Sequence, residues 1–230
     1  MNKVAWIIFG AAIVVVVGAL VIYSRAINPA IDVSKVDTNS ILVATDQSGG
    51  IADHVFDNAS SKVTLVEYGD FQCPYCGQAH PQVKALTTEY QDKIAFIFRN
   101  FPLTTVHPNA RAGAAAVEAA GLQGKYWDMH NLLYETQSDW VSLTGTDRTD
   151  KLASDAVSLG LNKDQFLKDF AGSSVDKKIS FDQALGKKLG VNSTPTFYLD
   201  GTKISDTVSS AIVNGDTTAI KALIDKELAK

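Results

Sequence analysis

The first long apolar pattern in the chain lies at its amino terminus. Residues 4–23 read VAWIIFGAAIVVVVGALVIY and contain no charged side chain. A helix rises about 1.5 Å per residue, so twenty such residues match a hydrocarbon core of about 30 Å. Trp6 and Tyr23 lie near the two ends, where amphipathic rings favour the membrane interface. The pattern predicts a transmembrane helix.

A cleaved signal peptide is the alternative for this segment. Ser24 and Ala26 are small residues at the spacing that a cleavage after Ala26 would need. The apolar run is, however, longer than the roughly 7–15 residues that are usual in a signal peptide. We therefore expect an uncleaved anchor over residues 1–25, and in both cases an exported domain behind it.

Two strongly apolar segments in the first half of the chain predict buried strands. They are KVTLVEY at 62–68 and KIAFIFRNF at 93–101, both rich in β-branched and aromatic residues. Between them, a helix is expected from near Cys73 to Tyr90, with Pro81 as a kink. A strand, a helix and a strand in this order indicate a βαβ unit with a parallel strand pair.

The pattern turns helical over 107–189 and returns to strand afterwards. The segment VNSTPTFYLDG at 191–201 predicts a strand and a turn, and 216–230 predicts an amphipathic helix. We therefore expect an α/β domain made of 61–106 and 190–230, interrupted by an inserted helical domain at 107–189. Residues 26–60 look like a stalk or linker, in which 41–43 and 54–56 are short apolar segments that could pack onto the domain.

Charge and cysteine content narrow the class of protein. The chain has 21 Lys and Arg against 25 Asp and Glu, a net charge of −4, which argues against a nucleic-acid-binding protein. A globular part of roughly 170 residues buries about 70% of its unfolded surface and needs no disulfide for stability. The two cysteines of the chain are therefore available for chemistry.

Cys73 and Cys76 form a Cys-x-x-Cys motif at the predicted helix start. Unpaired backbone N–H groups and the helix dipole stabilise a thiolate there, and the pKa of such cysteines falls to roughly 3.5–7.5. We expect Cys73 to be the exposed attacking thiol and Cys76 the resolving thiol. A structural disulfide, half of a zinc site with His80, and a pair of inert buried thiols are weaker alternatives. A structural disulfide would close too short a loop to add much stability, and a structural zinc site needs four ligands.

Three segments in the expected order resemble the DsbA-like branch of the thioredoxin-fold thiol–disulfide oxidoreductases. They are KVTLVEYGDFQCPYC at 62–76, the start of the helical block at 98–134, and VNSTPTFYLDG at 191–201. The resemblance covers roughly 62–229. It implies a thioredoxin-like fold with an inserted helical domain, here preceded by the predicted transmembrane helix.

The same resemblance implies roles for individual residues. Cys73 matches the nucleophile, Cys76 the resolving cysteine, and Pro195 the cis-proline that lies against them. Thr194, Pro74 and Tyr75 are then expected to contact the substrate. Glu67 matches a buried acid beneath the disulfide that exchanges a proton with Cys76, although Asp70 competes for this role. Tyr75 replaces the histidine of the strongest oxidants in the family. His80, His107 and His130 are expected to be structural.

We expect an extracytoplasmic enzyme that donates its Cys73–Cys76 disulfide to exported proteins that contain cysteines. The predicted location is the cell membrane, with a single span and the catalytic domain in the periplasm or at the cell surface. No cofactor is expected beyond the dithiol itself, and the resemblance implies a quinone-linked membrane oxidase as recycling partner. A membrane-tethered reductase or isomerase is one alternative, and a peptide-binding or chaperone module without turnover is another.

Overall fold

The computed structural model describes the backbone of residues 3–27 and 31–230, and the side chains of 6–20, 23 and 31–230. The chain divides into two units, Met1–Asp32 and Val33–Lys230. The first contains helix α1 (Lys3–Ile27). Among the described residues, no helix combines the length and the apolar character that a membrane crossing needs. The predicted span at 4–23 includes side chains outside the described residues, so the anchor stays a prediction.

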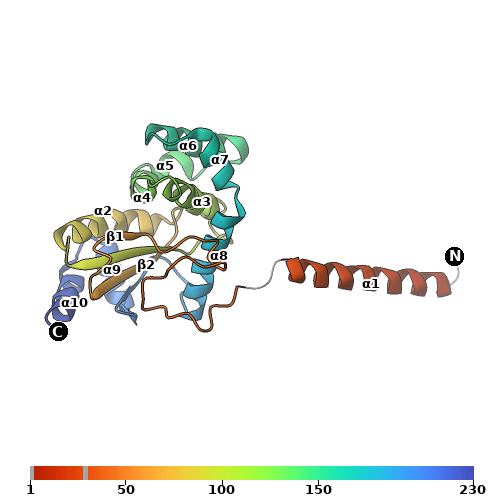
Figure 1. Ribbon diagram of the computed structural model, residues 1–230, viewed down its shortest axis with the longest axis horizontal. Helices are drawn as coiled ribbons and strands as arrows, with labels where there is room; N and C mark the ends of the chain where they lie inside the picture. Colours follow the sequence, from red (N-terminus) through yellow and green to blue (C-terminus); the bar gives the residue numbers. More distant parts are fainter. Residues whose placement is uncertain (1–2, 28–30) are drawn as a thin grey trace. The chain divides into compact units, whose positions relative to one another are not determined.

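The second unit is built on a sheet whose described strands follow the order β1-β3-β2-β4-β5 (Figure 1). The bounds are β1 (Val55–Asp57), β2 (Val63–Gly69), β3 (Ile94–Asn100), β4 (Thr196–Leu199) and β5 (Thr202–Lys203). Strands β2 and β3 are parallel and are joined through α2 (Pro74–Glu89), as the βαβ pattern predicted. The remaining neighbours pair antiparallel.

The strand register shows which side chains lie on each face of this sheet. Glu67 of β2 lies beside Phe98 of β3 and Phe197 of β4, so these three side chains share one face with the apolar core. That core also includes Val83 and Leu86 of α2, and residues of α9 (Asp206–Val213) and α10 (Thr218–Leu228). Alternation along the strands places Arg99 on the opposite face. The acid predicted beneath the cysteines is therefore directed into the core.

Helices fill the chain between β3 and β4, as predicted for 107–189. Their bounds are α3 (Ala110–Gly121), α4 (Tyr126–Glu135), α5 (Gln137–Trp140), α6 (Gly145–Ser158), α7 (Lys163–Phe170) and α8 (Ser173–Lys188). In Figure 1, α3 to α7 lie together, and α8 runs from them back to the sheet, where it contacts β3. The core of this helical insertion includes Trp140, Leu152 and Phe166, and extends to Phe71 and both cysteines. The insertion therefore packs directly against the active-site turn.

The prediction of a stalk over 26–60 is wrong for the part that begins at Val33. Residues 33–54, here called the strap, belong to the same unit as the sheet. Arg99 of β3 is fully buried and donates hydrogen bonds to the backbone oxygens of Thr38 and Ser40 and to the Asp53 carboxylate. Lys188 of α8 donates to three further strap carbonyls. The strap is thus held by the buried cation of Arg99 and the exposed cation of Lys188, and its Val33 and Ile51 side chains are buried. Residues 28–30 lie outside the described residues.

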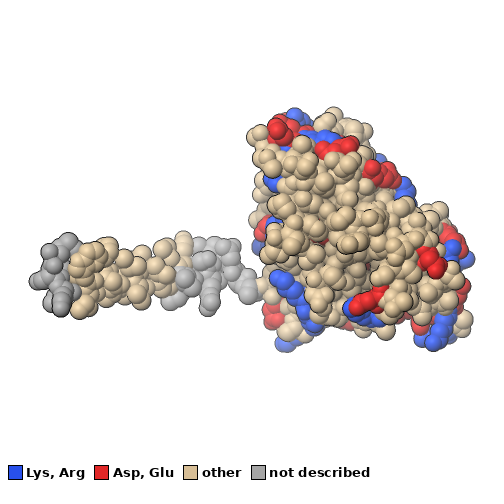
Figure 2. All heavy atoms as spheres, turned by 180° about the vertical axis from the view of Figure 1, so that it is seen from behind, with Lys and Arg blue, Asp and Glu red and all other residues tan. Residues whose placement is uncertain are grey.

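Figure 2 shows one face of the molecule, on which acidic and basic side chains lie near one another, mostly towards its edge. No continuous basic stripe crosses this face. This agrees with the small net charge of −4. The face offers no feature that would direct a strongly charged polymer to the domain.

Candidate active site

The two cysteines lie at the connection between β2 and α2 and in the first turn of α2. Cys73 is the N-cap residue of α2 with an extended backbone (φ −67°, ψ 123°), and Pro74 occupies the first helical turn. The N–H of Cys73 donates to the Asp70 carbonyl at 3.0 Å, and the N–H of Gly77 donates to the Cys73 carbonyl at 3.1 Å. Both thiols are free, so the structure shows the dithiol form. The predicted position at a helix start is confirmed.

The exposure predicted for Cys73 is wrong. Only 3% of Cys73 and 1% of Cys76 is accessible to solvent. The reason is a loop from the other end of the chain, because the Cys73 Sγ lies 3.4 Å from the carbonyl oxygen of Thr194. The backbone of Thr194 therefore covers part of the Cys73 sulfur. Sequence spacing within the motif does not reveal such a cover.

The local environment separates the two thiols electrostatically. The pKa of Cys73 is lowered to about 6, first by the hydrogen bond with the Cys76 thiol, then by the Thr194 side chain and by backbone N–H groups of α2, against an opposing effect of burial. The pKa of Cys76 is raised well above its ordinary value, mainly by burial. At neutral pH, Cys73 is therefore the thiolate and Cys76 the thiol. This is the division between an attacking and a resolving cysteine.

Glu67 lies beneath this pair as a buried acid. Glu67 is only 4% exposed. Burial is the largest cause that raises the pKa of its carboxyl group to about 8, and the negative charge of Cys73 is the second. The carboxyl group is therefore protonated at neutral pH. Its charge also affects the pKa of Cys76, which places the two groups within electrostatic reach of each other. A protonated acid in this position can give a proton to a departing Cys76 thiolate.

Asp70, the competing candidate for this acid, is engaged elsewhere. Its carboxylate accepts hydrogen bonds from the backbone N–H groups of Gln72 and Leu103, and lies 2.8 Å from Nδ1 of His107. It therefore fixes the turn that leads to Cys73. The geometry favours Glu67 over Asp70 as the proton-exchanging group.

A groove opens beside the cysteines at the predicted cis-proline. The Thr194–Pro195 peptide bond is cis. Thr194, Pro195 and Tyr75 line a cavity of about 310 Å³ together with polar side chains of α9. Tyr75 is 60% exposed, so its ring is available to a partner. Pro74, also predicted to contact substrate, is exposed at the helix start but does not line this groove.

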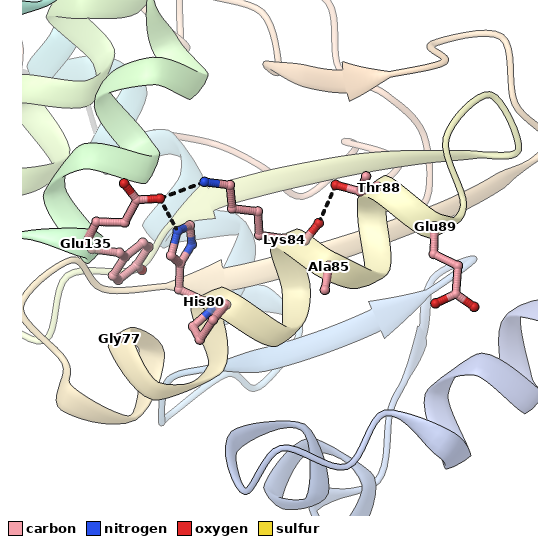
Figure 3. A pocket seen from close by; sticks show the side chains of 9 residues that line it. Gly77, His80, Lys84, Ala85, Thr88, Glu89 and Glu135 are labelled. Carbon is pink, nitrogen blue, oxygen red and sulfur yellow. Dashed lines mark hydrogen bonds and ion pairs between the residues drawn. The ribbon is translucent and has the colours of Figure 1, made fainter.

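A second cavity of about 770 Å³ runs along the other part of α2, from Gly77 to Glu89 (Figure 3). Two of its labelled side chains reach Glu135, which accepts a hydrogen bond from Lys84 at 2.6 Å and lies 3.9 Å from Nε2 of His80. Burial lowers the pKa of His80 to about 4. This histidine is therefore neutral and part of the aromatic packing around Tyr134. It supplies no charge to the dithiol.

Zinc chemistry was one alternative for the cysteine motif. Within the residues that the structure describes, no cluster of three or more His, Cys, Asp or Glu side chains is arranged to hold a metal ion. The Cys76 thiol is instead used in a hydrogen bond with Cys73. The donor set required for a structural zinc site is not assembled here.

Sequence reasoning missed one side chain at the site. Gln137 of α5 donates from Nε2 to the carbonyl oxygens of Phe71 and Cys73, both at 2.9 Å. The residues in contact are more than 60 positions apart, and nothing in the local sequence around Gln137 marks it. Only the packing of the helical insertion against the active-site turn brings them together.

A thiolate at a helix start, a buried acid below it and a cis-proline opposite define a thioredoxin-fold dithiol protein. A family model described as Thioredoxin matches residues 51–222, more than half of the chain. The protein belongs to this family. The predicted thioredoxin-like fold with its helical insertion is thereby confirmed.

Curated relatives match part of this chain. A Na(+)/H(+) antiporter NhaA 1 from Salinispora arenicola is 42% identical over 149 residues, 65% of this chain and 22% of that protein. This chain thus matches only about a fifth of the length of such curated relatives.

Two solved structures resemble the fold. A thioredoxin-like oxidoreductase from Silicibacter pomeroyi has 25% identity and a TM-score of 0.62, covering 80% of this chain and 98% of its own. The α-DsbA1 of Wolbachia pipientis has 22% identity and a TM-score of 0.63, covering 77% and 91%. The predicted resemblance to DsbA-like proteins is confirmed at the level of the fold, a thioredoxin-like domain with a helical insertion.

Proposed function

We propose that this protein is an exported oxidase that donates its Cys73–Cys76 disulfide to other proteins. The observation that carries the proposal is the lowered pKa of Cys73, about 6. The disulfide form carries no charge at this sulfur, whereas the dithiol form gains a stabilised thiolate. An environment that stabilises the reduced form makes the disulfide easier to give away.

The reaction transfers two electrons from the two substrate thiolates to the protein, and the one proton that the reduced protein gains, on Cys76, comes from solvent through Glu67. A substrate thiolate attacks the Cys73 sulfur, the Cys73–Cys76 bond breaks, and the departing Cys76 thiolate takes a proton from Glu67. A second substrate thiolate then attacks the substrate sulfur of the mixed disulfide, and Cys73 leaves as a thiolate. The products are a substrate disulfide and the reduced protein. Solvent returns the proton to Glu67.

The groove at Pro195 supports a polypeptide as the substrate. It begins beside Cys73 and is lined by the exposed ring of Tyr75 and by hydroxyl and amide side chains. Thr194 precedes the cis-proline at the edge of this groove, and its backbone can pair with an extended segment. We propose cysteine-containing exported proteins as substrates, and a quinone-linked membrane oxidase as the partner that restores the disulfide.

The proposed location rests on the uncharged run at 4–23 and on the chemistry. Such a run is long enough to hold the chain in a membrane as a single-pass anchor. Disulfide donation requires an oxidising compartment, so the catalytic unit would lie outside the cytoplasm. Alkaline extraction of cell membranes tests the anchor: the full-length chain should stay in the membrane pellet, and recovery in the soluble fraction would contradict it.

The decisive experiment is the equilibrium of the full-length chain with glutathione, read by thiol trapping of Cys73 and Cys76. We expect a potential of roughly −120 to −230 mV, between DsbA and the glutaredoxins. A value near −270 mV, the thioredoxin range, would overturn the oxidase proposal in favour of a reductase. The Cys73→Ser variant separates catalysis from mere binding: it should lose all exchange activity, whereas a peptide-binding module would keep its function.

A further inference from the structure

The carboxamide of Gln137 touches the active-site turn from outside the thioredoxin-like part of the fold. Its Nε2 donates one hydrogen bond to the carbonyl of Phe71 and one to the carbonyl of Cys73, both at 2.9 Å. Both hydrogens of the amide group are thereby used. The two carbonyls flank Gln72, so a single side chain fixes the backbone on both sides of the residue that precedes Cys73.

The place of this side chain is shaped by its neighbours. A Cβ atom added at Gly77 would come within 2.6 Å of the Gln137 Oε1, so the glycine leaves the space that the carboxamide occupies. On the same helix as Gln137, Trp140 is fully buried and donates from Nε1 to the carbonyl of Leu133 in α4 at 2.9 Å, which anchors α5 to α4. The side chain thus projects from a rigid element onto the start of α2.

The chemistry of Cys73 gives these hydrogen bonds a consequence. The sulfur becomes a thiolate in the dithiol form, and the partial negative charges of the Phe71 and Cys73 carbonyl oxygens oppose that charge. The Cys73 carbonyl also accepts from the N–H of Gly77, so Gln137 is its second donor. The Gln137 amide N–H groups donate to these two carbonyl oxygens, and so place partial positive charge at the turn. We propose that Gln137 is a positioning residue that sets the start of α2 so that the Cys73 thiolate, and with it the dithiol form, is stabilised. The inference rests on the proposed dithiol–disulfide exchange.

The other groups that influence Cys73 are already identified. Cys76 of α2 donates to it, Glu67 of β2 is protonated at neutral pH, and the carbonyl of Thr194 lies against its sulfur. None of these comes from the helical insertion. Gln137 therefore couples the insertion to the sulfur through the Cys73 backbone, and a change there can be measured separately from the others.

The test compares full-length Gln137→Met with full-length Gln123→Met. Methionine has nearly the length of glutamine but donates no hydrogen bond. Gln123 is a matched control, because its side chain also binds backbone groups within the insertion, the N–H and carbonyl of Asn162, but far along the chain from the site. The measurements are the pH dependence of Cys73 alkylation and the equilibrium constant with glutathione.

Gln137→Met should raise the pKa of Cys73 by about half a unit or more. It should also lower the equilibrium constant for reduction of the Cys73–Cys76 disulfide by glutathione about fivefold, which corresponds to about 20 mV. Gln123→Met should change neither. If Gln137→Met lowers the melting temperature but leaves the pKa and the equilibrium constant unchanged, Gln137 is only structural and the inference is overturned.

A second variant covers the case in which Gln137→Met does not fold. Gln137→Asn keeps the carboxamide but is one methylene shorter, so it cannot reach both carbonyls, and it should shift the pKa in the same direction by less. An unchanged pKa in this variant would contradict the inference. If the wild-type chain failed to exchange with glutathione at all, the proposed function would fail, while the alkylation profiles would still decide the role of Gln137.

Discussion

At the scale of single residues, Glu67 links the chemistry of the site to the stability of the protein. Its pKa is about 8 in the folded chain against an ordinary value of 4.5, mainly because the carboxyl group is buried. The folded protein therefore holds this proton more tightly than the unfolded chain does. The free energy of unfolding then falls as the pH rises from about 4.5 to about 8.

This linkage predicts that Glu67→Gln raises the free energy of unfolding of the reduced protein, although it removes the acid from the site. Glutamine has the shape of the protonated acid but no proton to lose, so the pH-dependent loss disappears. At about 1.4 kcal/mol per pH unit, the gain over the wild type should approach about 3 kcal/mol at pH 7 and vanish near pH 4. Urea unfolding of both reduced proteins between pH 4 and 8 measures it.

The matched control for this prediction is Glu89→Gln. Glu89 is 54% exposed and pairs with Lys221 on the surface, so its removal should change stability by less than about 1 kcal/mol at every pH. If Glu67→Gln were less stable than the wild type at pH 7, or if its advantage did not depend on pH, the acid would not be protonated as the geometry indicates.

At the scale of secondary-structure elements, the start of α2 depends on contact with α5. Gly77→Ala should displace the Gln137 side chain, because the new Cβ would lie within 2.6 Å of Oε1. Alanine favours the helix by about 0.5–1 kcal/mol over glycine, which offsets the lost contacts. We therefore expect little change in stability but a higher pKa for Cys73, measured by the pH dependence of alkylation.

A double-mutant comparison isolates this contact. In a Gln137→Ala background no side chain remains for the alanine at 77 to displace, so Gly77→Ala should have no further effect on the Cys73 pKa. Equal effects of Gly77→Ala in both backgrounds would show that it acts on α2 alone, and would remove the α5 contact from the explanation.

The elements that the sequence predicted well are those with a strong local signal. Strands β2 and β3 are mostly apolar and rich in β-branched and aromatic residues, and α2 begins at a proline after a turn at Asp70, so each could be placed before the structure was known. The cover over Cys73 could not, because Thr194 follows it by more than a hundred residues. Gln137 and the strap were missed for the same reason: their partners are backbone atoms and buried charges of distant segments.

At the scale of the whole molecule, the strap is joined to the sheet through buried charges. Asp53 accepts from Arg99 at 2.7 Å and lies 3.1 Å from the Lys178 ammonium group, and these three side chains are almost completely buried. The two cations lower the pKa of Asp53 to about 2 although burial opposes them. The isolated Arg99 within an apolar strand was the sequence signal for this arrangement, because a buried arginine requires an acidic partner.

Asp53→Asn should therefore destabilise the protein strongly and release the strap. The asparagine keeps the shape but leaves Arg99 without a counter-charge in the core, and breaking such a buried pair costs about 3–5 kcal/mol. Urea unfolding measures the global loss, and limited proteolysis at 33–54 measures the local release.

The surface pair of Asp206 with Lys203 provides the control for this effect. Asp206 is 88% exposed, so Asp206→Asn should change stability by less than about 1 kcal/mol and leave the strap protected.

Three outcomes for Asp53→Asn would contradict the prediction. If its strap resisted protease as well as that of the wild type, the attachment would depend instead on the hydrogen bonds from Arg99 and Lys188 to the strap backbone. Undiminished stability would show that Lys178 and Arg99 are sufficiently paired without Asp53. A loss confined to the strap would mean that the catalytic unit folds independently of residues 33–54.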